Sequence, residues 1–126
     1  NHLELKAKIN GVKGTFILDT GASNSCVGID MISYFNLDAK ESETKAAGAG
    51  AVDMETQQSE NNLLKIGDWK TKKCHLVLFD LTHVNTALTQ HKAKEVHGII
   101  GADILRKGKA FIDYNNNTLY LKKTKK

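Results

Sequence analysis

The sequence has 126 residues, a length that suits one folded domain with one modest hydrophobic core. Hydrophobic residues make up 40% and charged residues 25%, the ordinary balance of a soluble globular domain, and no apolar run approaches the roughly 18 residues of a membrane span. The net charge of +4 owes much to the basic tail 122–126, and aromatic residues at 6% are few for a nucleic-acid-binding face. We therefore expect no nucleic-acid partner and no membrane insertion within this chain. Because the chain begins at Asn1 and not at Met, we expect residues 1–126 to be a single domain from a longer or processed protein. The sequence does not indicate a cellular compartment.

The first predicted element is a β-hairpin. Apolar residues alternate with polar ones from Leu3 to Ile9, which is the period of a half-buried strand. Asn10-Gly11 follows and is a strong signal for a two-residue turn. The predicted return strand, Val12 to Leu18, leads directly into an acidic residue.

That acidic residue opens the stretch Asp19-Thr20-Gly21-Ala22-Ser23. An acid at the end of a buried strand is costly unless other groups hold it, and a glycine lets the backbone turn sharply. Thr20 is β-branched and stiff, and its hydroxyl can bond to main chain or to a partner. The stretch is therefore predicted to be a rigid turn that presents one carboxylate, Asp19. The simpler alternative is an aspartate that only stabilises the turn.

The next strand is predicted from Ser25 to Ile29, and Asp30 is a candidate cap for a short helix from Met31 to Asn36. Cys26 in that strand and Cys74 further along both lie in apolar, strand-like contexts. Buried free thiols are the plain interpretation, and a disulfide between them stays open.

Between residues 38 and 62 the composition changes to charged and small residues, with Ala46 to Ala51 at the centre. One interpretation is a disordered loop. Apolar and polar residues alternate from Val52 to Gln57, however, so a strand follows the glycines and a hairpin with a glycine-rich tip is the better interpretation. Gly48 and Gly50 do not form a dinucleotide-binding fingerprint, because no apolar strand precedes them and no helix follows.

A second hairpin is predicted from a strand at Leu63 to Ile66, a turn at Gly67-Asp68 and a long strand from Trp69 to Phe79. Asp80 to Val96 is polar and contains one short helical turn. The histidines in and just after this part match no zinc-binding spacing, so no metal site is expected at His83, His91 or His97.

The segment Ile99-Ile100-Gly101 is predicted to be a short buried strand that a glycine turns. Asp103 is a candidate cap for a short helix, with the next apolar residues turned inward and Gly108 at its end. A last hairpin is predicted from strands at 110–114 and 118–122, joined by three asparagines that tolerate positive φ.

Two of these segments together resemble a known family. Ile17-Leu18-Asp19-Thr20-Gly21-Ala22-Ser23 resembles the catalytic loop of aspartic proteases, and a short chain with one such loop resembles their single-domain, retropepsin-like branch. Ile99-Ile100-Gly101 resembles the segment that supports the catalytic loop in that family. The resemblance implies an all-β fold, a closed barrel of the acid-protease type with one or two short helices and a flap hairpin. It assigns the flap, and with it substrate binding, to Ala47, Gly48, Ala49 and Gly50.

The chain also departs from the retroviral members of the family. They usually carry a second acid where this sequence has Ser23, and an arginine where it has Ala102, so the ion pair that braces their dimer is missing here. The region 80–96 is longer than in the retroviral enzymes. These features resemble the cellular and bacterial retropepsin-like proteins more closely.

The resemblance implies an aspartic endopeptidase, a hydrolase that needs no cofactor or metal and acts on a peptide or protein substrate. Its two catalytic carboxylates would both be Asp19, one from each chain of a homodimer, because the sequence contains a single Asp-Thr-Gly. Thr20, Gly21, Ala22 and Ser23 would support the loop, with the Thr20 hydroxyl bonding across the dimer axis. Two alternatives stay open: a catalytically silent relative that serves as a dimerisation or peptide-binding module, and a small β-domain that binds a non-peptide ligand at the glycine loop.

Overall fold

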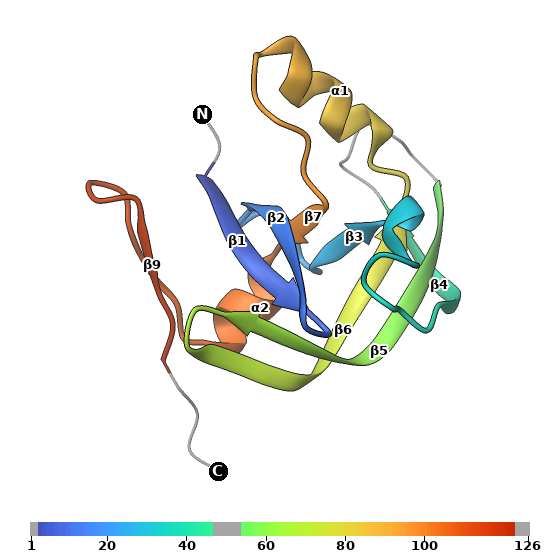
Figure 1. Cartoon of the computed structure of the whole chain (residues 1–126), viewed down its shortest axis with the longest axis horizontal. Coiled ribbons are helices and arrows are strands. Elements are labelled where there is room, and N and C mark those ends of the chain that lie inside the picture. Colours follow the sequence, from blue (N-terminus) through green and yellow to red (C-terminus); the bar gives the residue numbers. More distant parts are fainter. Residues whose placement is uncertain (1–2, 47–53, 123–126) are drawn as a thin grey trace.

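The computed structural model of the chain describes residues 3–46 and 54–122 (Figure 1). Its elements are, in order, β1 (Leu3–Ile9), β2 (Val12–Leu18), β3 (Cys26–Gly28), η1 (Ile29–Met31), β4 (Lys40–Ala46), β5 (Met54–Ile66), β6 (Trp69–Phe79), α1 (Thr82–Gln90), β7 (Gly98–Ile100), α2 (Ala102–Lys107), β8 (Phe111–Asp113) and β9 (Thr118–Tyr120).

The described strands form a barrel. One sheet has the strand order β1-β2-β7-β3-β6-β5-β4, and β1 pairs in addition with β5. That extra pairing, Lys8 opposite Lys65 and Ile9 opposite Leu64, closes the sheet on itself and leaves β4 as an extension beside β5 (Figure 1). The fold is therefore an all-β closed barrel, as the resemblance implies.

The interior of the barrel is filled by side chains that alternate along its strands. Ile9, Phe16 and Ile100 are fully buried, and the ring of Phe35 packs 6.1 Å from that of Phe16 between ring centroids. Successive side chains of a strand point to opposite faces, so the polar residues between the apolar ones of β1 lie on the outside. Burial of this alternate set fixes the register of each strand, since a shift by one residue would expose the whole set.

The predicted turns at the two main hairpins are confirmed. Asn10 and Gly11 have φ angles of 53° and 86°, the two left-handed residues that a type I′ turn requires. Gly67 has a φ of 57° at the start of the turn between β5 and β6. The long strand β6 covers the predicted residues Trp69–Phe79.

The segment after β3 differs from the helix predicted at Met31 to Asn36. A single 3-10 turn spans Ile29–Met31 and begins without a side-chain cap, so Asp30 lies inside the turn and caps nothing. The residues that follow form successive turns, and Asn36 has a φ of 56°. The Phe35 N–H donates to the Met31 carbonyl at 3.1 Å and the Leu37 N–H to the Ile32 carbonyl at 2.9 Å, so the left-handed Asn36 reverses the chain after one turn and leaves Phe35 fully buried.

Two helices lie outside the barrel. α1 takes the place of the predicted helical turn, and its Leu88 packs on Ile17 of β2 and on Val96. α2 follows β7 as predicted and ends at Gly108. Asp103 lies in the first turn of α2 and does not cap it, because the helix has no side-chain cap.

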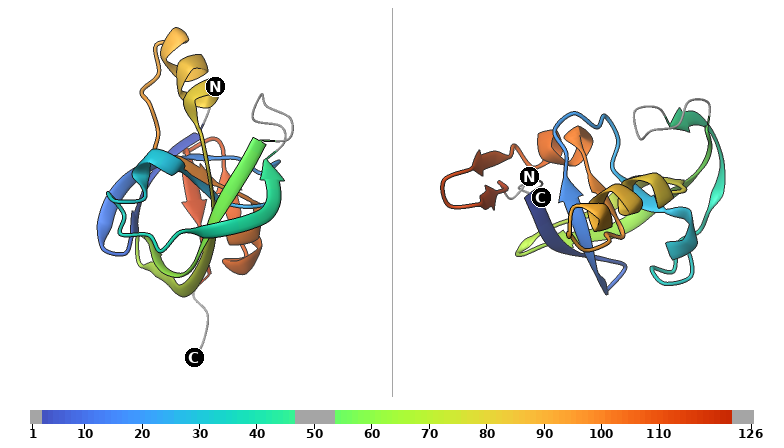
Figure 2. Two further views of the ribbon diagram at one scale, coloured as in Figure 1. Left: turned by 90° about the vertical axis from the view of Figure 1, so that its right-hand side faces the viewer. Right: turned by 90° about the horizontal axis from the view of Figure 1, so that it is seen from above.

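The last two strands, β8 and β9, form a hairpin that pairs only with itself. Figures 1 and 2 show it projecting from the barrel on the side of β1. It carries three large and strongly exposed aromatic residues, Phe111 at 64%, Tyr114 at 66% and Tyr120 at 53%.

The predicted flap hairpin is described on both sides of its tip. β4 and β5 pair in antiparallel fashion, and Ala46 opposite Met54 is the described pair nearest the tip. The predicted tip residues Ala47, Gly48, Ala49 and Gly50 lie outside the described residues.

Cys26 and Cys74 are free and buried, so the open question of a disulfide between them is answered. Within 3–46 and 54–122, no helix is long and apolar enough to cross a membrane.

Candidate active site

Asp19 stands directly after β2, where the chain leaves the barrel. Its N–H donates to the carbonyl of Ile100 on β7 at 3.0 Å, so the sheet holds the main chain up to the acid itself. Its side chain is exposed, and the Gly21 N–H donates to its Oδ1 at 2.9 Å. The Ala22 N–H donates to the Asp19 carbonyl at 3.2 Å and closes the turn. The loop therefore presents one carboxylate, which is held by a single main-chain donor, the Gly21 N–H.

The loop is supported by the unusual position of β7. This strand lies between β2 and β3, parallel to the first and antiparallel to the second. Ile99 stands opposite Ile17 on one side and opposite Cys26 on the other. The loop from β2 to β3 must therefore pass over the end of β7, which places Asp19 beside the turn that leads into α2.

Gly101 forms that turn and touches the loop. A Cβ atom at this position would lie 2.6 Å from the carbonyl oxygen of Ala22, closer than any real Cβ contact. The Ala102 N–H donates to the same oxygen at 2.7 Å. Only a residue without a side chain lets the two loops approach this closely.

A second connection joins the loop to α2. Ser25 is fully buried, and its Oγ donates to Asp103 Oδ1 at 2.7 Å while it accepts from the Gly101 N–H at 2.8 Å. The Ser25 N–H also donates to both carboxylate oxygens of Asp103, at 3.0 Å each. The Asp103 carboxylate thus ties the end of the Asp19 loop to the first turn of α2 (Ala102–Lys107).

The sequence predicts Asp103 as a helix cap and does not indicate this connection to Ser25. The carboxylate does accept from a helix N–H, that of Ile104 at 2.8 Å, but its other donors come from Ser25. A hydroxyl residue at the head of an apolar run is the one signal that could have drawn attention to Ser25, and its partner lies 78 residues away.

Cys26 follows Ser25 in the core and carries no chemistry of its own. Burial, and after it the negative charge of Asp103, raise the pKa of the Cys26 thiol to about 12. At neutral pH the thiol is protonated, and a protonated thiol is a poor nucleophile.

The remaining predicted residues of the loop lie at its surface. Thr20 and Ser23 are exposed, and neither hydroxyl has a hydrogen-bond partner in the part of the chain that the structure describes. Ala102 contributes its main chain to the loop contact and offers no charge. The pair of charges that braces retroviral dimers has no counterpart at these positions.

The histidines have structural or surface positions. The Thr15 N–H donates to His97 Nδ1 at 3.0 Å, and the His97 ring stacks on Tyr34 at 5.3 Å between centroids. His83 and His91 are exposed at the two ends of α1. Among the described residues no three His, Cys, Asp or Glu side chains gather to hold a metal ion.

Comparison with known proteins agrees with this geometry. The family model described as "Aspartyl protease" matches residues 5–104, which include the Asp19 loop, β7 and the start of α2. A search of curated proteins gave no match.

Several solved structures share the fold. The retroviral protease-like domain of Ddi1 from Leishmania major has a TM-score of 0.65 at 17% identity, covering 96% of this chain and 88% of its own. EIAV protease in complex with the inhibitor HBY-793 has a TM-score of 0.65 at 19% identity, covering 90% and 93%. A retropepsin-like aspartic protease from Rickettsia conorii has a TM-score of 0.61 at 21% identity, covering 89% and 76%. Because the family model spans most of the sequence, the chain belongs to the aspartyl protease family, and its fold is that of the retropepsin-like proteases.

Proposed function

We propose that this protein is an aspartic endopeptidase whose active site forms when two chains pair and bring their Asp19 carboxylates together. The observation that carries the proposal is the Asp19 loop: an exposed carboxylate at the end of a buried strand, held by the Gly21 N–H at 2.9 Å. Membership of the aspartyl protease family supports the same chemistry.

The chemistry needs two carboxylates that share one proton. Two carboxylates about 3 Å apart do not both ionise easily, so the pair holds one proton between them. The ionised carboxylate takes a proton from a water molecule as that water attacks the peptide carbonyl carbon, and the protonated one donates to the carbonyl oxygen. When the tetrahedral intermediate collapses, the C–N bond breaks and the proton taken from water passes to the leaving nitrogen. One hydroxyl of the intermediate returns its proton to the dyad as C=O reforms, which restores the shared proton. The water is activated by the dyad itself, so the scheme requires no metal.

One chain supplies only half of this site. The sequence contains a single Asp-Thr-Gly, and the other aspartates lack the Thr-Gly that follows Asp19. A two-fold symmetric dimer places the same loop twice beside its axis, which provides both carboxylates with one gene product.

The C-terminal hairpin offers a surface for this pairing. A groove of about 280 Å³ separates it from the start of β1 and from Leu18, the last residue of β2 before Asp19. The groove is lined mainly by Leu3, Leu5, Leu18, Ile112 and Leu119. Exposed aromatic residues are enriched in protein interfaces, and Phe111, Tyr114 and Tyr120 stand on the same hairpin. In a two-fold dimer, the C-terminal hairpin of the second chain would occupy this groove.

The test is cleavage of a mixed peptide library, read by mass spectrometry, by wild-type protein and by Asp19→Asn. The amide is nearly isosteric, and its oxygen can still accept from the Gly21 N–H, so we expect a folded dimer without activity. Asp38→Asn, an exposed acid outside the loop, serves as the matched control and should cleave normally. Clear cleavage by highly purified Asp19→Asn protein would contradict the mechanism, and binding without cleavage by the wild type would favour a catalytically silent module.

A second measurement tests the two-chain site. Far below the dimer dissociation constant the rate should grow with the square of chain concentration, and far above it linearly. In a 1:1 mixture of wild-type and Asp19→Asn chains, random pairing leaves about one dimer in four with two intact carboxylates. A rate that stays linear down to dilutions at which the protein sediments as a monomer would show that one chain is the active unit.

A further inference from the structure

Four lysines lie side by side across the outside of the barrel. Lys8 of β1 stands opposite Lys13 of β2 on one side and opposite Lys65 of β5 on the other. Lys65 in turn stands opposite Lys70 of β6. Residues directly opposite in antiparallel strands project from the same face, so Lys13, Lys8, Lys65 and Lys70 form one continuous line, called here the lysine row. With strands about 4.8 Å apart, the row is about 14 Å long.

The row carries charge that the described chain leaves without a partner. None of its four ammonium groups forms a hydrogen bond or ion pair among residues 3–46 and 54–122. Like charges directly opposite each other destabilise a sheet. Lysines often protect free sheet edges, but Lys8 and Lys65 are paired on both sides, so edge protection does not account for them.

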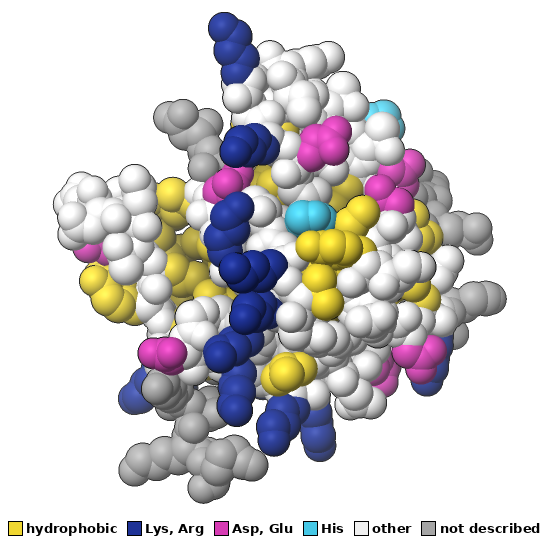
Figure 3. All heavy atoms as spheres, in the orientation of Figure 1, with side chains coloured by type: hydrophobic (Ala, Val, Ile, Leu, Met, Phe, Trp, Pro, Cys, Tyr) yellow, Lys and Arg dark blue, Asp and Glu magenta, His cyan; other side chains and the backbone are white. Residues whose placement is uncertain are grey.

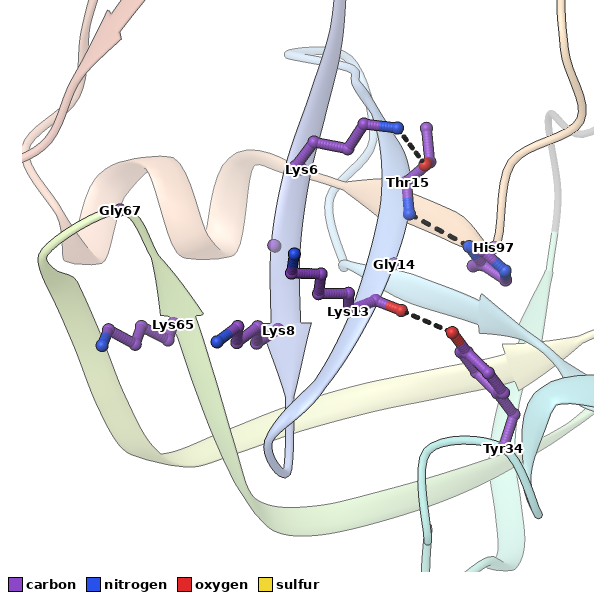
Figure 4. A pocket seen from close by; sticks show the side chains of 10 residues that line it. Lys6, Lys8, Lys13, Gly14, Thr15, Tyr34, Lys65, Gly67 and His97 are labelled. Carbon is purple, nitrogen blue, oxygen red and sulfur yellow. Dashed lines mark hydrogen bonds between the residues drawn. The ribbon is translucent and has the colours of Figure 1, made fainter.

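A groove lies beside three of the four lysines of the row. Its volume is about 570 Å³, and its lining includes the side chains of Lys8, Lys13 and Lys65. Figure 4 shows these three side chains extending from neighbouring strands around the groove, with Tyr34 and His97 at its far side. Lys6 adds a fifth ammonium group, which donates to Thr15 Oγ1 at 2.8 Å. In the space-filling view the basic side chains form a column over this face (Figure 3).

The arrangement suits an extended, acidic stretch of polypeptide. An extended chain advances about 3.3 Å per residue, so the row spans about four residues. Single-stranded nucleic acid is bound by aromatic side chains on which its bases stack, and the row itself consists of lysines alone. Tyr34 lines the far side of the groove, and one face of its ring is stacked against His97. Arginine, which binds phosphate through two parallel hydrogen bonds, occurs once in the sequence, at Arg106 on α2. The row therefore lacks the residue type best suited to a phosphate backbone.

We infer that the lysine row is a docking site for an acidic segment of the protein substrate, remote from the scissile bond. The inference rests on the proposed endopeptidase function and adds a substrate class to it: proteins that carry a run of Asp or Glu outside the cleaved sequence. Lys13 and Asp19 lie near opposite ends of β2, six residues apart along the strand, or about 20 Å. A substrate can therefore occupy both places only through a linker of that reach.

The test joins a cleavable peptide, identified from the library, to six glutamates or six glutamines through a Gly-Ser linker. A linker of about twelve residues has a mean span of about 19 Å, which matches the separation. We expect a lower KM for the glutamate substrate at low salt, an unchanged kcat, and loss of the difference as ionic strength rises. Charge reversal in Lys8→Glu with Lys65→Glu should raise that KM about tenfold, because exposed ion pairs are each worth a few-fold.

Two controls distinguish an effect of the lysine row from an effect of net charge, and a failure of docking from a failure of the proposed endopeptidase function. Lys92→Glu with Lys94→Glu makes the same charge change at exposed sites outside the row and should leave KM within about twofold. Binding of a fluorescent hexaglutamate peptide to Asp19→Asn protein, followed by anisotropy, measures docking without catalysis. If no peptide is cleaved, the proposed function fails while this binding still tests the row. Equal binding of hexaglutamate to the row variant and the control variant, or tighter binding of hexathymidylate than of hexaglutamate, would overturn the inference.

Discussion

Replacing Asp103 by alanine tests whether the loop that carries Asp19 depends on α2. The substitution removes the acceptor for the N–H and the hydroxyl of Ser25, which is 0% exposed. The third donor, the Ile104 N–H, lies in the first turn of a short helix, where water can replace the carboxylate. A buried donor left without a partner costs about 1–3 kcal/mol, so the two donors of Ser25 together predict a loss of about 2–6 kcal/mol.

Ser25→Ala probes the same connection from the other side. It keeps the Ser25 main-chain bond to Asp103 but leaves the Gly101 N–H without its acceptor, for a loss of about 1–3 kcal/mol. In the double variant the hydroxyl that Asp103→Ala leaves unpaired no longer exists. The double variant should therefore lose less stability than the sum of the two single variants, by about 1–3 kcal/mol.

The assay is urea unfolding followed by tryptophan fluorescence. Trp69 is the single tryptophan and is 4% exposed, so it reports on the barrel as a whole. Asp38→Ala removes an exposed acid outside the site and should stay within about 0.5 kcal/mol of the wild type. If Asp103→Ala also unfolds within 0.5 kcal/mol of the wild type, or if the two losses are strictly additive, the loop does not depend on this connection.

Three further predictions concern the turn at Gly101, the two buried thiols and the Thr20 hydroxyl. Gly101→Ala places a Cβ atom 2.6 Å from the Ala22 carbonyl oxygen, so the Asp19 loop must shift. Because a misplacement of 1 Å in an active site costs roughly 10²-fold in rate, cleavage should fall at least tenfold. Unchanged activity would refute the tight approach of the two loops. Burial raises the pKa values of the Cys26 and Cys74 thiols to about 12. At pH 8 both thiols should therefore react with Ellman's reagent only after the protein unfolds. Rapid reaction of the folded protein would contradict this. Thr20→Ala should weaken the proposed dimer by about 1–3 kcal/mol if its exposed hydroxyl bonds across the axis, and an unchanged dissociation constant in analytical ultracentrifugation would argue against that role.

Features that depend on near neighbours could be predicted from the sequence. Asn10-Gly11 specifies its hairpin turn by its own φ preferences, and the alternation from Leu3 to Ile9 specifies which face of β1 is buried. The bounds of β6 follow in the same way, since Gly67-Asp68 ends the preceding strand. The turn inside the Asp19 loop is local in the same sense, because its bonds from Gly21 and Ala22 join near neighbours. Such features need only the chemistry of a few consecutive residues.

Features that join distant parts of the chain were decided by the tertiary structure. The bond between Ser25 and Asp103 exists only because β7 lies between β2 and β3, and no local pattern in either segment announces the other. Phe35 is a second example, because its fully buried ring packs against Phe16, which lies 19 residues earlier in the chain. The lysine row is a product of barrel closure: Lys8 and Lys65 become neighbours only when β1 pairs with β5. Strand register across a closed barrel is set by the packing of its whole interior, and a sequence read residue by residue does not contain it.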